Sequence, residues 1–240
     1  MESPTKLLLA SIFVCLLAST AGAVEVSFPE EELPSEVVTP ILDSRDAVRS
    51  RLVAMTGRFD VSLLTGWILD EPFYNNQYLS VSSVYHFNEG WGLGFEYLKF
   101  TSGPSSYGDQ FKGSTQKLDF SRAPQVKSVM GLMLQKYFLY GKISWSKDTV
   151  TPIAAYFAAD LTMADYGTKN LPWFSLGAGQ KIFFGRNWGA EISLKAMVRQ
   201  QINPLSQELS LNSTPAPNTS TFTTKTKIGE DLQIKGFYYF

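Results

Sequence analysis

Apolar side chains recur at every second position through most of this chain, and few folds accommodate that spacing. In the segment 188–200, for example, Ile192 and Leu194 alternate with Ser193 and Lys195. A period of two is that of a β-strand with one apolar face, because successive side chains of a strand point to opposite sides. Eight such runs occur: 57–69, 77–87, 91–100, 127–137, 152–162, 173–184, 188–200 and 231–240. The pattern predicts an all-β fold of eight antiparallel strands.

The connections between these runs alternate in length. Residues 88–90 and 185–187 are tight turns, whereas 102–123 and 202–225 are long and rich in Ser, Thr, Gly and Pro. An up-and-down transmembrane β-barrel has short periplasmic turns and long outer loops. Because successive connections of such a barrel alternate between its two ends, the connections 70–76 and 163–172 also fall on the outer side. The 137–150 connection breaks the rule, and we expect it to hold a small hairpin or a turn of helix.

The N-terminus has the organisation of a secretory signal. Lys6 precedes the apolar run 7–17, and Ala21-Gly22-Ala23 forms a small-x-small cleavage site. We therefore predict a signal peptide over 1–23. The only cysteine, Cys15, lies inside this run, so disulfide or thiolate chemistry is not expected in the mature chain. No later apolar run reaches the roughly 18 residues of a spanning helix, so a membrane form must be a closed barrel.

Residues 24–56 differ from the rest of the chain. They are acidic and proline-punctuated at first and then become compatible with a short helix, which Asp43 can cap and Asp46 can stabilise in its first turn. We expect 24–56 to form a periplasmic N-terminal segment and 57–240 to form the barrel.

The face opposite the apolar one carries charges. A soluble barrel would have to bury these charges in its apolar core, which is costly unless nearly all are paired. Pointed at lipid, each Lys or Arg near midplane would cost about 2–4 kcal/mol. A polar lumen accommodates these charges. The charges therefore favour a membrane barrel with a polar lumen, although a soluble secreted barrel stays an alternative. The predicted lumen network comprises Arg58, Asp60, Glu96, Asp160, Lys181, Glu191, Lys195 and Arg199.

Tryptophans mark the expected membrane boundary. Each of the two tight turns is followed by Trp-Gly, at 91–92 and 188–189, where an aromatic girdle belongs. The predicted girdle comprises Trp67, Trp91, Trp173 and Trp188.

The last run ends on an aromatic residue with apolar residues at alternate positions behind it: Leu232, Ile234, Tyr238 and Phe240. This ending resembles the C-terminal signature of Gram-negative outer-membrane proteins, although Gly236 departs from the pattern. The resemblance implies insertion by the barrel-assembly machinery. A wider resemblance, carried by "ELPSEVVTPILDSRDAVRSR", "GRFDVSLLTGWILDEPFYNN" and "YFLYGKIS", is to outer-membrane β-barrel domain proteins of predatory, myxobacterial-type bacteria. This resemblance implies a barrel in the outer membrane. It implies no activity that could be assigned to this chain.

The residues leave three functions open. Eight strands enclose a lumen that side chains can fill, which favours a structural or surface-interaction protein that acts through its outer loops. A narrow ion or small-solute channel is the first alternative. A lipid-modifying enzyme is the second, and it would need the single histidine, His86, which the strand count places at the periplasmic end.

Partners and cofactors follow from composition and location. A net charge of −1 gives no sign of nucleic-acid binding. No bound metal or cofactor is expected. The expected partners are outer-membrane lipid or lipopolysaccharide, the barrel-assembly machinery, and a periplasmic or extracellular protein of unknown identity.

Overall fold

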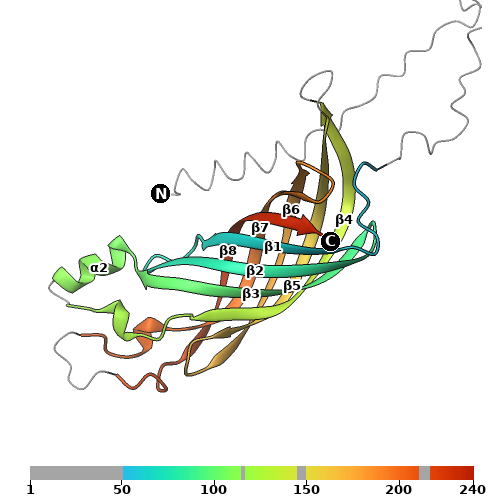
Figure 1. Ribbon diagram of the computed structural model, residues 1–240. Helices are drawn as coiled ribbons and strands as arrows, with labels where there is room; N and C mark the ends of the chain where they lie inside the picture. Colours follow the sequence, from blue (N-terminus) through green and yellow to red (C-terminus); the bar gives the residue numbers. More distant parts are fainter. Residues whose placement is uncertain (1–50, 115–116, 145–149, 211–216) are drawn as a thin grey trace, which may run out of the picture. The chain divides into compact units, whose positions relative to one another are not determined.

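Eight antiparallel strands close into one barrel in chain order (Figure 1). The computed structural model describes residues 51–114, 117–144, 150–210 and 217–240. The strands are β1 (Phe59–Ile68), β2 (Tyr74–Asn88), β3 (Trp91–Pro104), β4 (Ser128–Ser144), β5 (Val150–Asp165), β6 (Asn170–Phe183), β7 (Trp188–Ile202) and β8 (Thr224–Tyr239). Pairing of β1 with β8, as at Thr65 and Ile234, completes the barrel. The predicted all-β, eight-stranded, up-and-down antiparallel architecture is confirmed.

The connections gather by length at the two ends of the barrel. The turns after β2 and β6 are short, and the C-terminal end of β8 lies at the same end (Figure 1). At the other end lie helix α2 (Ser106–Gly113) and the 3-10 turns η2 (Phe120–Arg122) and η3 (Pro204–Ser206). These two ends are called the short-turn end and the long-loop end below. Within the described residues, no helix is both long and apolar enough to cross a bilayer.

The predicted 137–150 connection is largely strand. β4 runs on to Ser144 and β5 begins at Val150, and these two residues pair. The hairpin alternative is therefore the correct one for the described residues. The predicted signal peptide and the predicted helix near Asp43 lie outside the described residues.

The apolar faces of the strands point outward. Each strand contributes large apolar side chains that are about half exposed, among them Leu63, Leu79, Phe95, Leu132, Leu161, Leu176, Ile192 and Ile234. The alternate residues of the same strands point inward, and the charged ones among them are nearly fully buried except near the strand ends, as at Lys227, which is partly exposed. The fold is therefore apolar on its outside and polar in its middle.

Apolar clusters close both ends of this polar interior. At the short-turn end, Val53 and Met55 are buried with inward-facing aromatic residues that include Tyr137, Tyr156 and Phe237. At the long-loop end, Phe73 stacks on Phe120 with ring centroids 4.4 Å apart.

Candidate functional site: the lumen of the barrel

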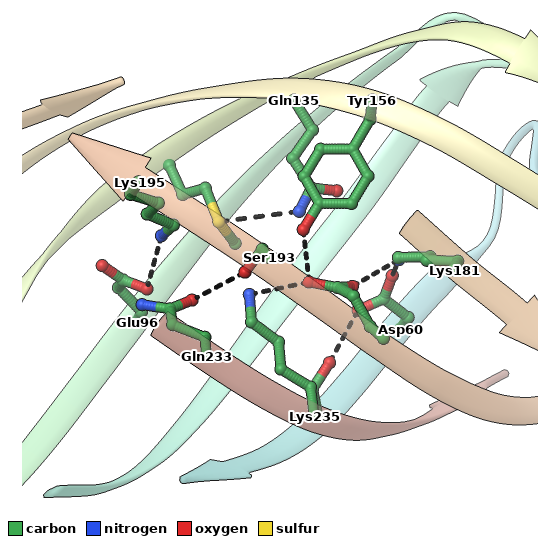
Figure 2. Close-up of polar contacts among 12 residues, drawn as sticks. Asp60, Glu96, Gln135, Tyr156, Lys181, Ser193, Lys195, Gln233 and Lys235 are labelled. Atoms are coloured by element: carbon green, nitrogen blue, oxygen red, sulfur yellow. Dashed lines mark hydrogen bonds and ion pairs between the residues drawn. The ribbon is translucent and has the colours of Figure 1, made fainter. Parts of the chain in front are cut away.

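The lumen is lined by inward-facing polar residues from all eight strands, because each strand contributes every second side chain (Figure 2). They form three groups of ionic contacts along the barrel. These groups are called the first, second and third ion clusters, counted from the short-turn end.

The first ion cluster comprises Asp60, His86, Lys181, Glu191 and Lys235. Lys181 Nζ lies 2.7 Å from Asp60 Oδ2 and 3.7 Å from Glu191 Oε2. Lys235 Nζ lies 3.0 Å from Glu191 Oε1, and Tyr156 donates its hydroxyl to the same carboxylate. With two carboxylates and two ammonium groups, this cluster balances its charge without His86.

The second ion cluster comprises Glu96, Asp160, Lys195 and Asp231. Lys195 Nζ lies 2.6 Å from Asp160 Oδ2 and 3.7 Å from Glu96 Oε2. Tyr78 donates its hydroxyl to Asp231 at 2.7 Å. Three carboxyl groups here face one ammonium group, so the second cluster has more acid than base.

The third ion cluster lies toward the long-loop end and comprises Asp70, Glu71, Arg199 and Lys227. Arg199 Nη2 lies 2.8 Å from Asp70 Oδ2 and 2.6 Å from Glu71 Oε1. Lys227 Nζ lies 2.9 Å from Asp70 Oδ2 and 3.2 Å from Glu71 Oε1. The connection between β1 and β2 is thereby held across the mouth of the barrel.

Large side chains fill the lumen by lying over glycines of the neighbouring, paired strands. A Cβ added at Gly179 would lie 2.4 Å from the Tyr156 ring, and one at Gly66 would lie 2.3 Å from the Tyr78 ring. Two cavities, one at the long-loop mouth beside Glu71 and Arg199 and one in the lumen beside Glu96 and Lys195, have volumes of about 30 and 20 Å³, each enough for about one or two waters. The lumen is therefore packed rather than open over the described residues.

Seven of the eight residues predicted for the lumen network lie there, namely Asp60, Glu96, Asp160, Lys181, Glu191, Lys195 and Arg199. Arg58 does not. It lies at the short-turn rim, where its guanidinium donates to the carbonyl oxygens of Ala54, Arg186, Tyr239 and Phe240. Arg58 lies just before β1, where the chain enters the barrel from residues 51–57. Its side chain therefore reaches the rim carbonyls and not the interior.

Several residues of the lumen are absent from the predicted network. Alternation places Lys235 on the polar face of the last run, and the same parity continues to Asp231. The alternation of polar and apolar residues gives no information about Asp70 and Glu71, because they lie between strands. Their role comes from contact with Arg199, which is 129 residues from Asp70 and 128 residues from Glu71 in the chain.

Three of the four predicted girdle tryptophans lie on the outer face, and one does not. Trp91 and Trp188 are exposed, and Trp67 is half-buried among outward residues. Trp173 points inward instead: its Nε1 donates to the Gln200 carbonyl at 2.9 Å, and the Arg199 guanidinium lies 5.7 Å from its ring centroid. Its position on β6 has the same parity as Lys181, and parity outweighs the tryptophan's interfacial preference.

The residues of the predicted insertion signal all lie on the outer face of β8 or just after it. Ile234, Tyr238 and Phe240 are exposed and Leu232 is half-buried. Phe240 packs its ring against Tyr238 and Phe59, with centroids 4.9 and 6.5 Å away.

His86 lies in the lumen with no exposed surface. Its Nε2 is 2.8 Å from Asp60 Oδ2, and its Nδ1 has no hydrogen-bond partner among the described residues. A general base must reach its substrate, and this imidazole is enclosed by Tyr137 and Tyr239. Across the described ranges, no group of three or more His, Cys, Asp and Glu side chains is arranged to hold a metal ion.

Comparisons with known proteins give likeness of structure alone. No family model matches the chain, and no curated protein matches it in sequence. The N-terminal β-barrel domain of OprF from Pseudomonas aeruginosa is 10% identical, with 77% of this chain and 98% of that chain covered and a TM-score of 0.40. The outer membrane protein OprG from the same organism is 9% identical, with 80% and 99% covered and a TM-score of 0.39.

The attachment invasion locus protein Ail of Yersinia pestis is 13% identical, with 78% of this chain and 100% of that chain covered and a TM-score of 0.33. Because these TM-scores are below 0.5, the barrel assignment rests on the strand pairing of this chain and not on the likenesses.

Proposed function

We propose that this chain is an integral outer-membrane β-barrel with a structural or surface-interaction role, a packed polar lumen and long extracellular loops. The observation that carries the proposal is the apolar outer face of the barrel, to which all eight strands contribute and which Glu230 of β8 interrupts opposite Ala196. A soluble protein rarely exposes an apolar patch larger than a few hundred Å², whereas every strand of this barrel exposes large apolar residues.

The height of the apolar belt suits a bilayer. On β7 the outward residues from Trp188 to Val198 contain no charge. Ten residues at roughly 3.3 Å each, tilted by about 40°, give a belt about 25 Å tall, as in known outer-membrane barrels. Aromatic residues at the short-turn rim, such as Trp91 and Trp188, favour that end as a membrane interface.

A structural role is favoured over a channel because the charged side chains inside the barrel form ion pairs with one another. The three ion clusters and the apolar ends occupy the path that a solute would need. Steady conductance of the purified protein in planar bilayers would contradict the packed lumen. A lipid-modifying enzyme is less well supported, since His86 has no exposed surface.

A pair of substitutions on the outer face tests membrane insertion. Leu194 lies mid-belt on β7, and Thr226 is an outward residue of β8 beyond the belt. Leu194→Arg should cost about 2–4 kcal/mol of stability in lipid vesicles, and Thr226→Arg about 0–1 kcal/mol. Unfolding in denaturant measures both. Equal costs at the two positions, or release of the wild-type protein from membranes without detergent, would contradict insertion.

The remaining assignments are part of the same proposal. The chain is exported through the Sec pathway and cleaved near Ala23, residues 24–56 stay in the periplasm, and the barrel-assembly machinery inserts the barrel. The proposed external partner binds the long loops, and no enzymatic activity is assigned. The resemblance to barrels of myxobacterial-type bacteria stays a prediction from the sequence.

A further inference from the structure

Two outward-facing charges lie at the edge of the apolar belt, on different walls of the barrel. Glu230 is exposed on β8 between the outward residues Ile228 and Leu232. Lys99 is exposed on β3, and the outward residue before it is Tyr97. Each charge therefore borders apolar side chains of its own strand, where a charge without a partner is unfavourable in contact with lipid.

Neither side chain has an ionic or hydrogen-bonding partner within the described ranges of the chain. Asp165, at the end of β5, lies two paired strands away from Lys99, and its Oδ1 accepts from the Gly167 amide at 2.6 Å. On the other wall, the backbone carbonyl of Glu230 accepts from the Leu69 amide at 3.0 Å. The Lys99 ammonium and the Glu230 carboxylate are thus left to whatever contacts the belt from outside.

The strand register shows how steeply the strands are inclined around the barrel. A line of paired residues can be followed once around all eight strands: Ile68, Asp231, Lys195, Gly177, Ala158, Gln135, Gly92, His86 and Arg58. The line begins and ends on the β1 side but returns ten residues (68 − 58) nearer the short-turn end. Each of the eight steps in this direction therefore descends by about 1.25 residues (10/8), which is the stagger that closes the barrel.

The same register places Lys99 and Glu230 at one level. From Lys99, the paired residues in the descending direction are Leu79 on β2, Thr65 on β1 and Ile234 on β8. These three steps descend by about four residues, and Glu230 lies four residues (234 − 230) from Ile234 toward the long-loop end. The two charges therefore lie within about one residue, or roughly 3 Å, of the same height.

A second copy of the chain in the same membrane presents the complementary charge at the matching depth. Within one copy, Lys99 and Glu230 are three strands apart and point in different directions, so they cannot pair with each other. Copies inserted in the same orientation share one depth, so the lysine of one copy can reach the carboxylate of its neighbour. A lipid phosphate attracts Lys99 but is repelled by Glu230, so it satisfies only one of the two charges.

The surroundings of Glu230 suit such a contact. Glu230 is paired with Ala196 on β7, whose short, exposed side chain leaves the carboxylate open. A lysine side chain can lie along apolar surface while its ammonium reaches the carboxylate. The pair would form at the edge of the hydrocarbon, where ionic attraction is stronger than in water.

We propose that a second copy of this chain docks against the β8 wall of the barrel through its β3 wall, with the partner's Lys99 paired to Glu230. The inference rests on the proposed membrane location and adds a partner and a contact surface. Because the two contacting walls differ, the contact is of the head-to-tail type and leaves one wall of each kind open to a further copy.

Energy transfer between labelled barrels in zwitterionic vesicles tests the proposal. Gly113→Cys provides a labelling site at the exposed end of α2, where nothing lies within 4 Å of an added Cβ. Donor- and acceptor-labelled mature chains are expected to show more transfer than randomly mixed barrels at the same density. Lys99→Glu and Glu230→Lys should each weaken association about fivefold or more, which is the effect of losing an ion pair worth about 1 kcal/mol. The double variant should recover the association, because its two charges are exchanged.

Lys136→Glu is the matched control. Lys136 is also exposed and outward-facing on β4, but it lies at the short-turn rim, with Nζ 4.7 Å from the Trp91 ring centroid, so transfer should be unchanged. Random-level transfer of the wild type, failure of the double variant to recover, or equal loss in the control would each overturn the proposal. Association that requires lipid A in the vesicles would also overturn it, since a lipid phosphate would then be the partner of Lys99.

Insertion into the vesicles is scored before transfer is measured, and only inserted variants are compared. A wild-type barrel that does not insert would contradict the membrane location itself, which separates that failure from a failure of the contact between copies.

Discussion

Glycines determine where the largest lumen side chains can lie. Gly179→Ala would push a methyl group into the Tyr156 ring, which is fully buried and donates to Glu191. Overpacking of this kind typically costs about 1–3 kcal/mol, and a similar loss of unfolding free energy is expected here. Gly236→Ala is the control, because nothing lies within 4 Å of a Cβ at this strand position. It should be neutral or slightly stabilising, and equal losses at both sites would contradict a packed lumen.

Glu89 attaches residues 51–57 to the barrel, and its contacts favour the ionised carboxylate. Partial burial opposes its ionisation, but hydrogen bonds from the amides of Met55 and Thr56 and from the Thr56 hydroxyl, together with Arg51, lower its pKa. A carboxyl whose folded pKa is lowered contributes stability above its ordinary value of 4.5 and loses it as pH falls through the folded value.

Protection of the Met55 and Thr56 amides from hydrogen exchange is therefore expected to be constant from neutral pH to about pH 5 and to fall at lower pH. Glu89→Gln should lower the protection at neutral pH and remove this pH dependence. An unchanged acid profile in that variant would show that another group attaches the segment.

At the scale of elements, the second ion cluster links β3, β5, β7 and β8 with unequal partners. Asp160 makes the short contact to Lys195 and accepts from Ser175, whereas Glu96 Oε2 makes no hydrogen bond within the described residues. Asp160→Asn leaves Lys195 without its nearest anion and should cost about 3–5 kcal/mol. Glu96→Gln removes surplus negative charge and should change stability by less than about 1 kcal/mol. Denaturant unfolding in vesicles compares these isosteric variants, and a reversed order would refute the assignment of Asp160 as the main partner.

Alternation predicted which strands form and which face of each is polar, because parity alone decides the side to which a strand residue points. The prediction failed where the alternation of inward and outward residues along a strand is interrupted. The register of β4 against β5 shifts between Tyr137 and Leu139, so that Phe138 and Leu139 are both exposed. This irregularity made the end of β4 resemble a connection in the sequence.

Contacts between elements were beyond what the sequence could predict. Val53 and Met55 belong to a segment that the sequence analysis assigned to an N-terminal extension, yet both are buried at the short-turn end. Asp70 and Glu71 pair with Arg199 only because closure of the barrel brings the β1–β2 connection beside β7 and β8. A single sequence carries no local signal for such pairs.

At the scale of the whole molecule, the account depends on an inside-out distribution of polarity. The ion clusters are buried, their surroundings are filled by aromatic residues and glycines, and the apolar residues face outward. A bilayer stabilises this arrangement, because apolar residues then contact acyl chains while the charges pair away from lipid. The long loops are the surface on which the proposed external partner would bind.

Cysteine labelling at two neighbouring positions of β7 tests this distribution most directly. Leu194 points outward, and Ser193 points inward, where its hydroxyl donates to Gln233 at 3.3 Å. In vesicles, Leu194→Cys should react with a lipid-soluble maleimide and its probe should be quenched from within the acyl chains, whereas Ser193→Cys should react only after unfolding. Labelling of Ser193→Cys in the folded protein with Leu194→Cys protected would contradict the account.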